Sequence, residues 1–176
     1  SRFDGPDFVV LTGFLGSGKT TLLRDFLELP QGADTAVIVN EVGEIGLDGA
    51  ILRESGAGTP IAMLSNGCIC CQAGSDLAHT VDALLAVERP GAQGPLRRIV
   101  LETSGLSKPG PVLRQLASLA EHRVKVSVVS TFDATCGMRP AVFEEAAAQW
   151  AAAHRIVVTK ADALSEGALA RSRDEA

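Results

Sequence analysis

The fold is decided by residues 13–21, which read Gly13-Phe14-Leu15-Gly16-Ser17-Gly18-Lys19-Thr20-Thr21. This stretch fits the pattern G-x-x-x-x-G-K-[ST], which is typical of a loop that holds phosphate groups. Residues 8–11 before it form a short apolar, β-branched run, as expected for a buried strand. Apolar residues recur at helical spacing between positions 22 and 29 after it. Strand, glycine-rich loop and helix therefore follow one another in the order that phosphate binding requires.

The residue types in this loop have a clear chemical purpose. Glycines permit a tight turn in which backbone N–H groups point inward, and the next helix directs its positive N-terminal end at the phosphates. We expect Lys19 to reach the β- and γ-phosphates and to be needed for catalysis, and the Thr20 hydroxyl to coordinate Mg²⁺. An ordinary turn with a surface lysine is disfavoured by the flanking strand and helix. The predicted nucleotide-binding residues are Gly13, Gly16, Ser17, Gly18, Lys19, Thr20 and Thr21.

Length and composition narrow the class of protein. The chain has 176 residues, of which 46% are hydrophobic, and this suits a single domain spanning 1–176. A net charge of −5 argues against a nucleic-acid partner. No apolar run approaches the roughly 18 residues needed to cross a bilayer, and the first residues lack a secretory segment. We therefore expect no membrane partner and a cytoplasmic location, where cysteines favour metal binding or reactivity over disulfides.

Short apolar runs alternate with helical patterns along the rest of the chain. The predicted strands are 8–11, 35–40, 61–64, 99–101, 124–129 and 156–158, and helices are expected from Ser75, from Pro111, over 141–153 and over 164–173. Because the strands are apolar without polar alternation, they predict an α/β fold with a mainly parallel sheet flanked by helices. Functional loops should then meet at the carboxyl ends of the strands. The sequence predicts a P-loop nucleoside triphosphatase fold.

Two acidic residues that follow strands are candidates for the reaction. Glu102 closes the apolar run 99–101, a position from which a carboxylate orients Mg²⁺ or its bound water. Gly105, three residues later, is expected to offer its backbone N–H to the γ-phosphate as a switch. Glu41 follows the strand 35–40 and, like Glu102, is a candidate for orienting the attacking water. A solvated acid at a strand end is the alternative interpretation of Glu102.

The stretch Thr159-Lys160-Ala161-Asp162 is a candidate for reading the base. Guanine presents two adjacent N–H donors that one carboxylate accepts together, and a lysine stem can lie along the base. Asp162 and Lys160 supply these parts, which favours GTP over ATP. The alternative is a strand-to-helix turn in which Asp162 caps a helix.

Three cysteines are clustered in Cys68-Ile69-Cys70-Cys71. Cysteines so close in sequence are poorly placed to bridge one another, whereas clustered thiolates suit Zn²⁺. A tetrahedral ion needs a fourth ligand, for which Glu44, water or a client's ligand are candidates. A redox or incidental cluster is the alternative. Cys136 stands apart and is interpreted as a core cysteine.

These stretches, in this order, resemble the CobW family of metal-related P-loop GTPases (CobW/HypB/UreG-type, SIMIBI class). The resemblance rests on the loop at 13–21, Asn-Glu-x-Gly-Glu from Asn40, Asn-Gly-Cys-x-Cys-Cys from Asn66, Glu-Thr-Ser-Gly from Glu102, and Thr-Lys-x-Asp from Thr159. It implies slow GTP hydrolysis with Mg²⁺, and Zn²⁺ or Co²⁺ held by Cys68, Cys70, Cys71 and Glu44. Family members usually continue into a smaller C-terminal domain, and we expect this chain to correspond to the GTPase domain alone.

The sequence thus predicts a GTP-hydrolysing metallochaperone domain that delivers Zn²⁺ or Co²⁺ to a client metalloprotein. The alternative is a nucleotide-regulated metal sensor or buffer with little turnover. A P-loop kinase is disfavoured by the cysteine cluster and by residues 159–162. Because no arginine finger can be assigned, a partner or a nucleotide-dependent homodimer could complete the site.

Overall fold

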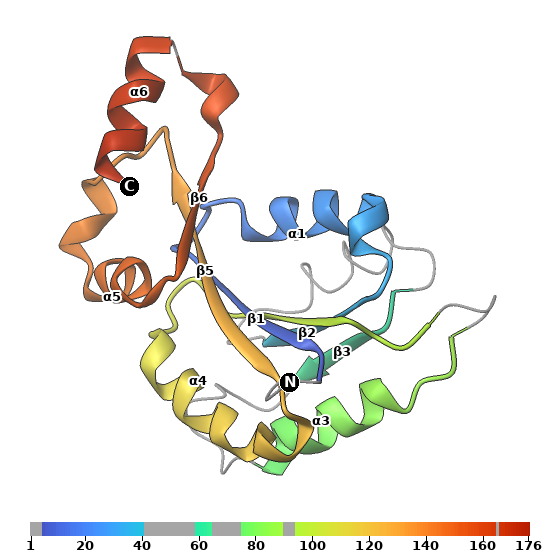
Figure 1. Ribbon diagram of the computed structural model, residues 1–176. Coiled ribbons are helices and arrows are strands. Elements are labelled where there is room, and N and C mark those ends of the chain that lie inside the picture. The colour runs from blue at the N-terminus through green and yellow to red at the C-terminus, as the bar shows by residue number, and fades with distance from the viewer. Residues whose placement is uncertain (1–4, 41–58, 65–74, 90–93, 165) are drawn as a thin grey trace.

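The computed structural model describes residues 5–40, 59–64, 75–89, 94–164 and 166–176. Six strands form one sheet in the order β3-β2-β4-β1-β5-β6, and every neighbouring pair is parallel (Figure 1). The strands are β1 (Asp7–Thr12), β2 (Thr35–Asn40), β3 (Ile61–Leu64), β4 (Arg98–Glu102), β5 (Lys125–Asp133) and β6 (Arg155–Thr159). The helices are α1 (Lys19–Glu28), α3 (Ser75–Leu85), α4 (Pro109–Gln115), α5 (Glu144–Ala152) and α6 (Glu166–Glu175).

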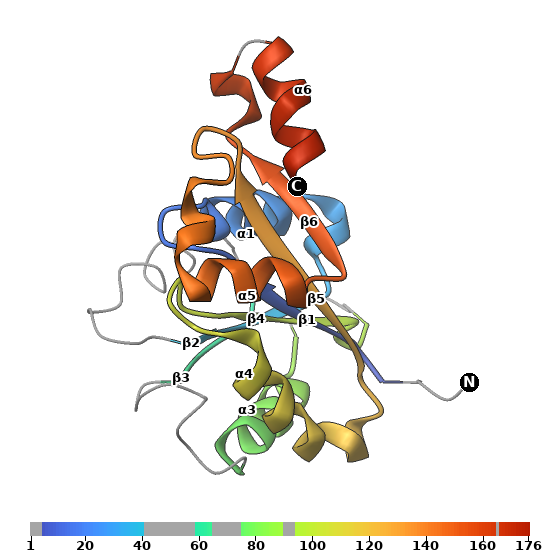
Figure 2. The ribbon, with the colours of Figure 1, turned by 90° about the vertical axis from the view of Figure 1, so that its left-hand side faces the viewer.

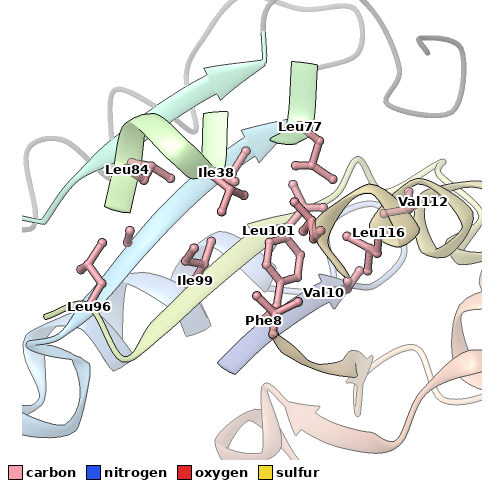
Figure 3. Close-up of a cluster of buried hydrophobic side chains, with 14 of the residues drawn as sticks. Phe8, Val10, Ile38, Leu77, Leu84, Leu96, Ile99, Leu101, Val112 and Leu116 are labelled. Carbon is pink, nitrogen blue, oxygen red and sulfur yellow. The ribbon is translucent and has the colours of Figure 1, made fainter. Parts of the chain in front are cut away.

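Helices cover both faces of the sheet, which explains the uniformly apolar strands. On one face, α3 and α4 pack over alternate strand residues such as Phe8, Val10 and Leu101 (Figure 3). On the other face, α1 places Leu23 and Leu27 against the intervening strand residues. Figure 1 shows α1 and the pair α3 and α4 on opposite sides of the strands. The predicted parallel α/β fold is confirmed.

The strand order places β1 at the point where the chain changes direction across the sheet. After β1, the chain forms β2 and then β3 on one side of β1, and it returns to insert β4 between β2 and β1. Strands β5 and β6 are then added on the other side of β1. Ligands of open parallel sheets bind beyond the carboxyl ends of the strands at such a point. The loop that follows β1 lies there, with the ends of β4, β5 and β6 as neighbours.

Three sequence expectations need correction. The predicted helix 141–153 is instead a 3₁₀ turn, Arg139–Val142, followed by α5, because Phe143 is extended and leaves Glu144 to begin the helix. Strand β5 continues past the predicted end at Val129, since Ser130 and Thr131 pair with β6 although they are polar. Cys136 lies half-buried in the turn after β5 and is not a core residue. Within the described residues, no helix combines the length and apolarity needed to span a membrane.

Candidate nucleotide site

The glycine-rich loop joins β1 directly to α1, which begins at Lys19. Gly16 and Gly18 have φ angles of 68° and 90°, a left-handed backbone that glycine adopts without strain. Gly13 leaves no room for a side chain, because a Cβ there would collide with the Thr131 hydroxyl. Thr131 in turn shares a buried 2.6 Å hydrogen bond with the Ser17 hydroxyl. The loop is therefore shaped by its own glycines and braced by the end of β5.

Lys19 is buried and its ammonium group lies over the loop. Its Nζ donates to the carbonyl oxygen of Gly13 at 2.7 Å and to that of Phe14 at 3.4 Å. The positive charge is thus held beside the backbone whose N–H groups are expected to bind phosphate. This arrangement can attract and neutralise an anion at the N-terminus of α1.

Thr20 and Glu102 lie 82 residues apart in sequence and meet in the structure. The Thr20 hydroxyl donates to Glu102 Oε1 at 2.9 Å. Glu102 ends β4, the neighbour of β1, and is only 4% exposed, so it is not the solvated acid of the alternative interpretation. Together the two side chains present hard oxygen donors, the ligand type that Mg²⁺ prefers.

The loop after β4 packs directly against the glycine-rich loop. A Cβ added at Gly105 would lie 2.8 Å from the backbone nitrogen of Leu15, so only glycine allows this approach. The side-chain amide of Gln149 on α5 donates to the carbonyl oxygens of Gly105 at 2.9 Å and Ser107 at 3.0 Å. Sequence reasoning found Gly105 but missed Gln149, which has no sequence signal because its α5 neighbours are mostly alanines.

Residues 159–162 also contact the glycine-rich loop. The Thr159 hydroxyl donates to the carbonyl oxygen of Ser17 at 2.6 Å, and Lys160 Nζ donates to that of Gly16 at 2.7 Å. Lys160 has a φ of 57°, a strained conformation for a lysine, and it precedes the 3₁₀ turn Ala161–Ala163. Asp162 lies inside that turn with an exposed side chain, so it does not occupy the helix cap of the alternative interpretation.

Asp133, at the end of β5, anchors Lys160 and was not predicted from the sequence. Lys160 Nζ donates to Asp133 Oδ2 at 2.7 Å, and Thr135 donates to Oδ1 from its backbone at 2.9 Å and from its hydroxyl. Burial raises the pKa of Asp133, but the hydrogen bonds from Lys160 and Thr135 outweigh it and hold the pKa below the usual 3.8. An apolar strand that closes on an acid identified Glu102, and the same signal at Phe132-Asp133 would have found this residue.

The remaining predicted residues fall in two groups. Thr21 lies in the first turn of α1, immediately after the Mg²⁺ candidate. Glu41, Glu44, Cys68, Cys70 and Cys71 lie outside the described residues. Across the ranges that the structure describes, no three His, Cys, Asp or Glu side chains are grouped so that they could hold a metal ion. The cysteine-based metal site therefore stays a prediction.

Comparison with known proteins agrees with this geometry. The family described as CobW/HypB/UreG, nucleotide-binding domain, matches residues 7–176. The zinc chaperone CobW of Pseudomonas aeruginosa is 32% identical over 198 residues, which cover 94% of this chain and 52% of that protein. The zinc chaperone YjiA of Escherichia coli is 37% identical over 163 residues, covering 89% and 50% respectively. The chain thus spans about half the length of these curated relatives.

Solved structures show the same fold. A crystal structure of a Zn(II)-bound triple mutant of the YjiA GTPase has a TM-score of 0.66 at 28% identity and covers 96% of this chain and 53% of that one. Nickel-bound HypB from Helicobacter pylori has the same TM-score at 15% identity, covering 97% and 74%, and supports the fold alone. Because the family model matches residues 7–176, we conclude that this chain belongs to the CobW/HypB/UreG family and corresponds to its nucleotide-binding domain.

Proposed function

We propose that this chain is the GTP-binding and GTP-hydrolysing domain of a metallochaperone. The observation that carries the nucleotide part is the hydrogen bond between Thr20 and Glu102, because it joins the glycine-rich loop to an acidic strand end at the start of α1. A magnesium ion would be held there by the Thr20 hydroxyl and the Glu102 carboxylate, directly or through water. When bound, it would neutralise charge on the β- and γ-phosphate oxygens.

Recognition of guanine is assigned to residues 159–162. The exposed Asp162 carboxylate accepts the two adjacent N–H donors of guanine, and the Lys160 stem lies along the base. Support comes from the two bonds that fasten this stretch to the backbone of Gly16 and Ser17, because they fix the base reader relative to the phosphate loop. Adenine lacks that pair of donors, so the site is expected to favour GTP over ATP.

Hydrolysis in this site is a matter of position and charge. Water attacks the γ-phosphorus in line, the bond from that phosphorus to the β–γ bridging oxygen breaks, and GDP and phosphate leave. Lys19 is expected to exchange its bonds to the loop carbonyls for phosphate oxygens, and the Gly105 N–H to bind the γ-phosphate. Glu41 stays a candidate for orienting the water together with Glu102. Without an assigned arginine finger, turnover should be slow.

The metal part of the proposal rests on Cys68, Cys70, Cys71 and Glu44, supported by relatives that are named zinc chaperones. The cargo is Zn²⁺ or Co²⁺, and the recipient is a client metalloprotein. The cluster falls between the strand that precedes Glu41 and the strand that ends at Glu102. In this proposal, the nucleotide state changes the geometry of the metal ligands, which is a way to release an ion.

A chelator competition with Zn²⁺, performed with and without GTP and Mg²⁺, tests the coupling. We expect nucleotide to shift the Zn²⁺ affinity, Cys70→Ser to abolish the site, and the matched control Cys136→Ser to leave it intact. Equal Zn²⁺ affinity with and without nucleotide contradicts the metallochaperone proposal. GTP turnover that rises with Zn²⁺ supports delivery, whereas tight nucleotide binding without turnover favours the sensor or buffer alternative.

A further inference from the structure

Helix α5 carries two consecutive side chains that reach two parts of the nucleotide site. Gln149 is fully buried and its Nε2 donates to the carbonyl oxygens of Gly105 and Ser107. Trp150 Nε1 donates to the carbonyl oxygen of Thr131, whose hydroxyl braces the glycine-rich loop. The helix lies beside α4 and against β5 (Figure 2). Helix α5 therefore contacts both the loop after β4 and Thr131, which supports the glycine-rich loop.

The orientation of the Gln149 amide is fixed by its partners. Both partners are carbonyl oxygens, so the NH₂ group must face the loop and donate both of its hydrogens to it. Its Oε1 has no hydrogen-bond partner among the described residues. A buried, unpaired carbonyl oxygen is unfavourable, and an apolar side chain of the same length would avoid it. Packing alone therefore does not explain an amide at this position, whereas its two hydrogen bonds to the loop do.

The loop after β4, which Gln149 binds, is also the loop that approaches the glycine-rich loop. Gly105 packs against the backbone of Leu15, and Gln149 donates a hydrogen bond to the carbonyl oxygen of the same Gly105. A second connection runs from the end of this loop to the start of α5, where Lys108 and Glu144 form an exposed 2.8 Å ion pair. Helix α5 therefore contacts the loop after β4 at two points, of which the buried amide of Gln149 is the one protected from solvent.

We propose that Gln149 is a positioning residue that fixes Gly105 at the phosphate loop, so that its backbone N–H is ready for the γ-phosphate of GTP. The proposal rests on the proposed function and adds the source of selectivity for GTP over GDP. GDP has no γ-phosphate to accept from the Gly105 N–H, so we expect its affinity to depend little on the position of this loop. A loop that is already in place does not lose further conformational freedom when GTP binds. Release of the loop should therefore weaken GTP binding alone.

The test compares the affinities for GDP and for a non-hydrolysable GTP analogue, measured by calorimetry at constant Mg²⁺. Gln149→Met keeps the length of the side chain and removes both donors, and Gln149→Asn keeps the amide on a stem too short to reach both carbonyls. We expect the analogue to bind about fivefold or more weakly to Gln149→Met, with a smaller loss for Gln149→Asn, since two hydrogen bonds are lost or weakened. GDP affinity should be unchanged in both.

A matched control is Ala146→Gly, which loosens the same helix one turn earlier at a buried position with no hydrogen-bonding side chain. It should lower thermal stability without changing the ratio of the two affinities. An unchanged ratio in the Gln149 variants, or an equal loss of both nucleotides, overturns the positioning role and leaves Gln149 as a structural contact. Failure of the unmodified chain to bind either guanine nucleotide would instead overturn the proposed function.

Discussion

Replacement of Asp133 by Asn tests whether this buried carboxylate positions Lys160, the lysine that we propose contacts the guanine base. Lys160 Nζ is held between Asp133 Oδ2 and the carbonyl oxygen of Gly16, both at 2.7 Å. Asn has nearly the same shape as Asp, but an NH₂ donor replaces one of the two oxygens that accept from Lys160 and Thr135, so the substitution removes the charge and one of these acceptors. Lys160 also has a strained, left-handed backbone. Its place against the phosphate loop should therefore depend on the ion pair.

The size of the effect follows from the exposure of the two partners. A hydrogen bond to a charged group contributes about 1.5–3 kcal/mol when it is well protected. Asp133 is 8% exposed, but the Lys160 side chain is 44% exposed, and solvent screening lowers the contribution of such a pair. We therefore expect Asp133→Asn to lower the free energy of unfolding by about 1 kcal/mol. If the whole of this energy serves to position Lys160 for GTP, the GTP affinity becomes roughly fivefold weaker. In a chain of this size, the melting temperature should fall by about 2–4 °C.

The pH dependence of the same variant supplies a second readout. The pKa of Asp133 lies below its usual 3.8 in the folded protein, so its contribution to stability is present above that value. The contribution is lost as the pH falls through the folded pKa, because the protonated carboxyl no longer pairs with Lys160. The difference in melting temperature between the unmodified chain and Asp133→Asn should be constant at neutral pH and shrink below 3.8.

Calorimetric titration with GTP decides the outcome, with Asp34→Asn as the matched control. Asp34 forms an ion pair of 2.8 Å with the buried side chain of Arg89. Asp34 lies just before the amino-terminal end of β2, whereas the phosphate loop follows the carboxyl end of β1. Loss of this ion pair should lower stability without changing GTP affinity. If Asp133→Asn lowers stability but binds GTP as tightly as the unmodified chain, the carboxylate does not position Lys160 and the reasoning is refuted.

Three further substitutions probe the phosphate site. Lys19→Met should weaken GTP binding about 100-fold or more in calorimetry, because two or more charge-assisted bonds to phosphate are lost; a loss of less than tenfold contradicts its role. Glu102→Gln should raise the Mg²⁺ concentration needed for half-maximal GTP hydrolysis about tenfold or more, and an unchanged Mg²⁺ dependence excludes it from the metal site. Gly105→Ala places a Cβ 2.8 Å from the Leu15 nitrogen, so single-turnover GTP hydrolysis should slow about tenfold while GDP affinity stays constant. Weaker GDP binding in that variant would indicate general damage to the loop.

Much of the fold follows from local sequence patterns. The apolar runs gave the six strands, because strands covered by helices on both faces need side chains that are buried on both sides. The errors occurred where local and tertiary preferences differ. Ser130 and Thr131 ended the apolar run, yet pairing with β6 keeps them in the strand. Phe143 fitted the helical pattern, yet it is extended and 52% exposed and stacks on Phe14 of the phosphate loop.

The sequence by itself determined the phosphate loop, because its chemistry is local: glycines, a lysine and a threonine at fixed spacing before one helix. It also singled out Glu102, Gly105, Lys160 and Asp162 as polar or glycine residues after strands. Only the tertiary structure decided which other side chains hold these groups. Thr131 meets Ser17 across 114 residues, and Gln149 meets Gly105 across 44. Such contacts depend on the strand order β4-β1-β5-β6, which sets strand ends side by side in an order that the linear sequence does not contain.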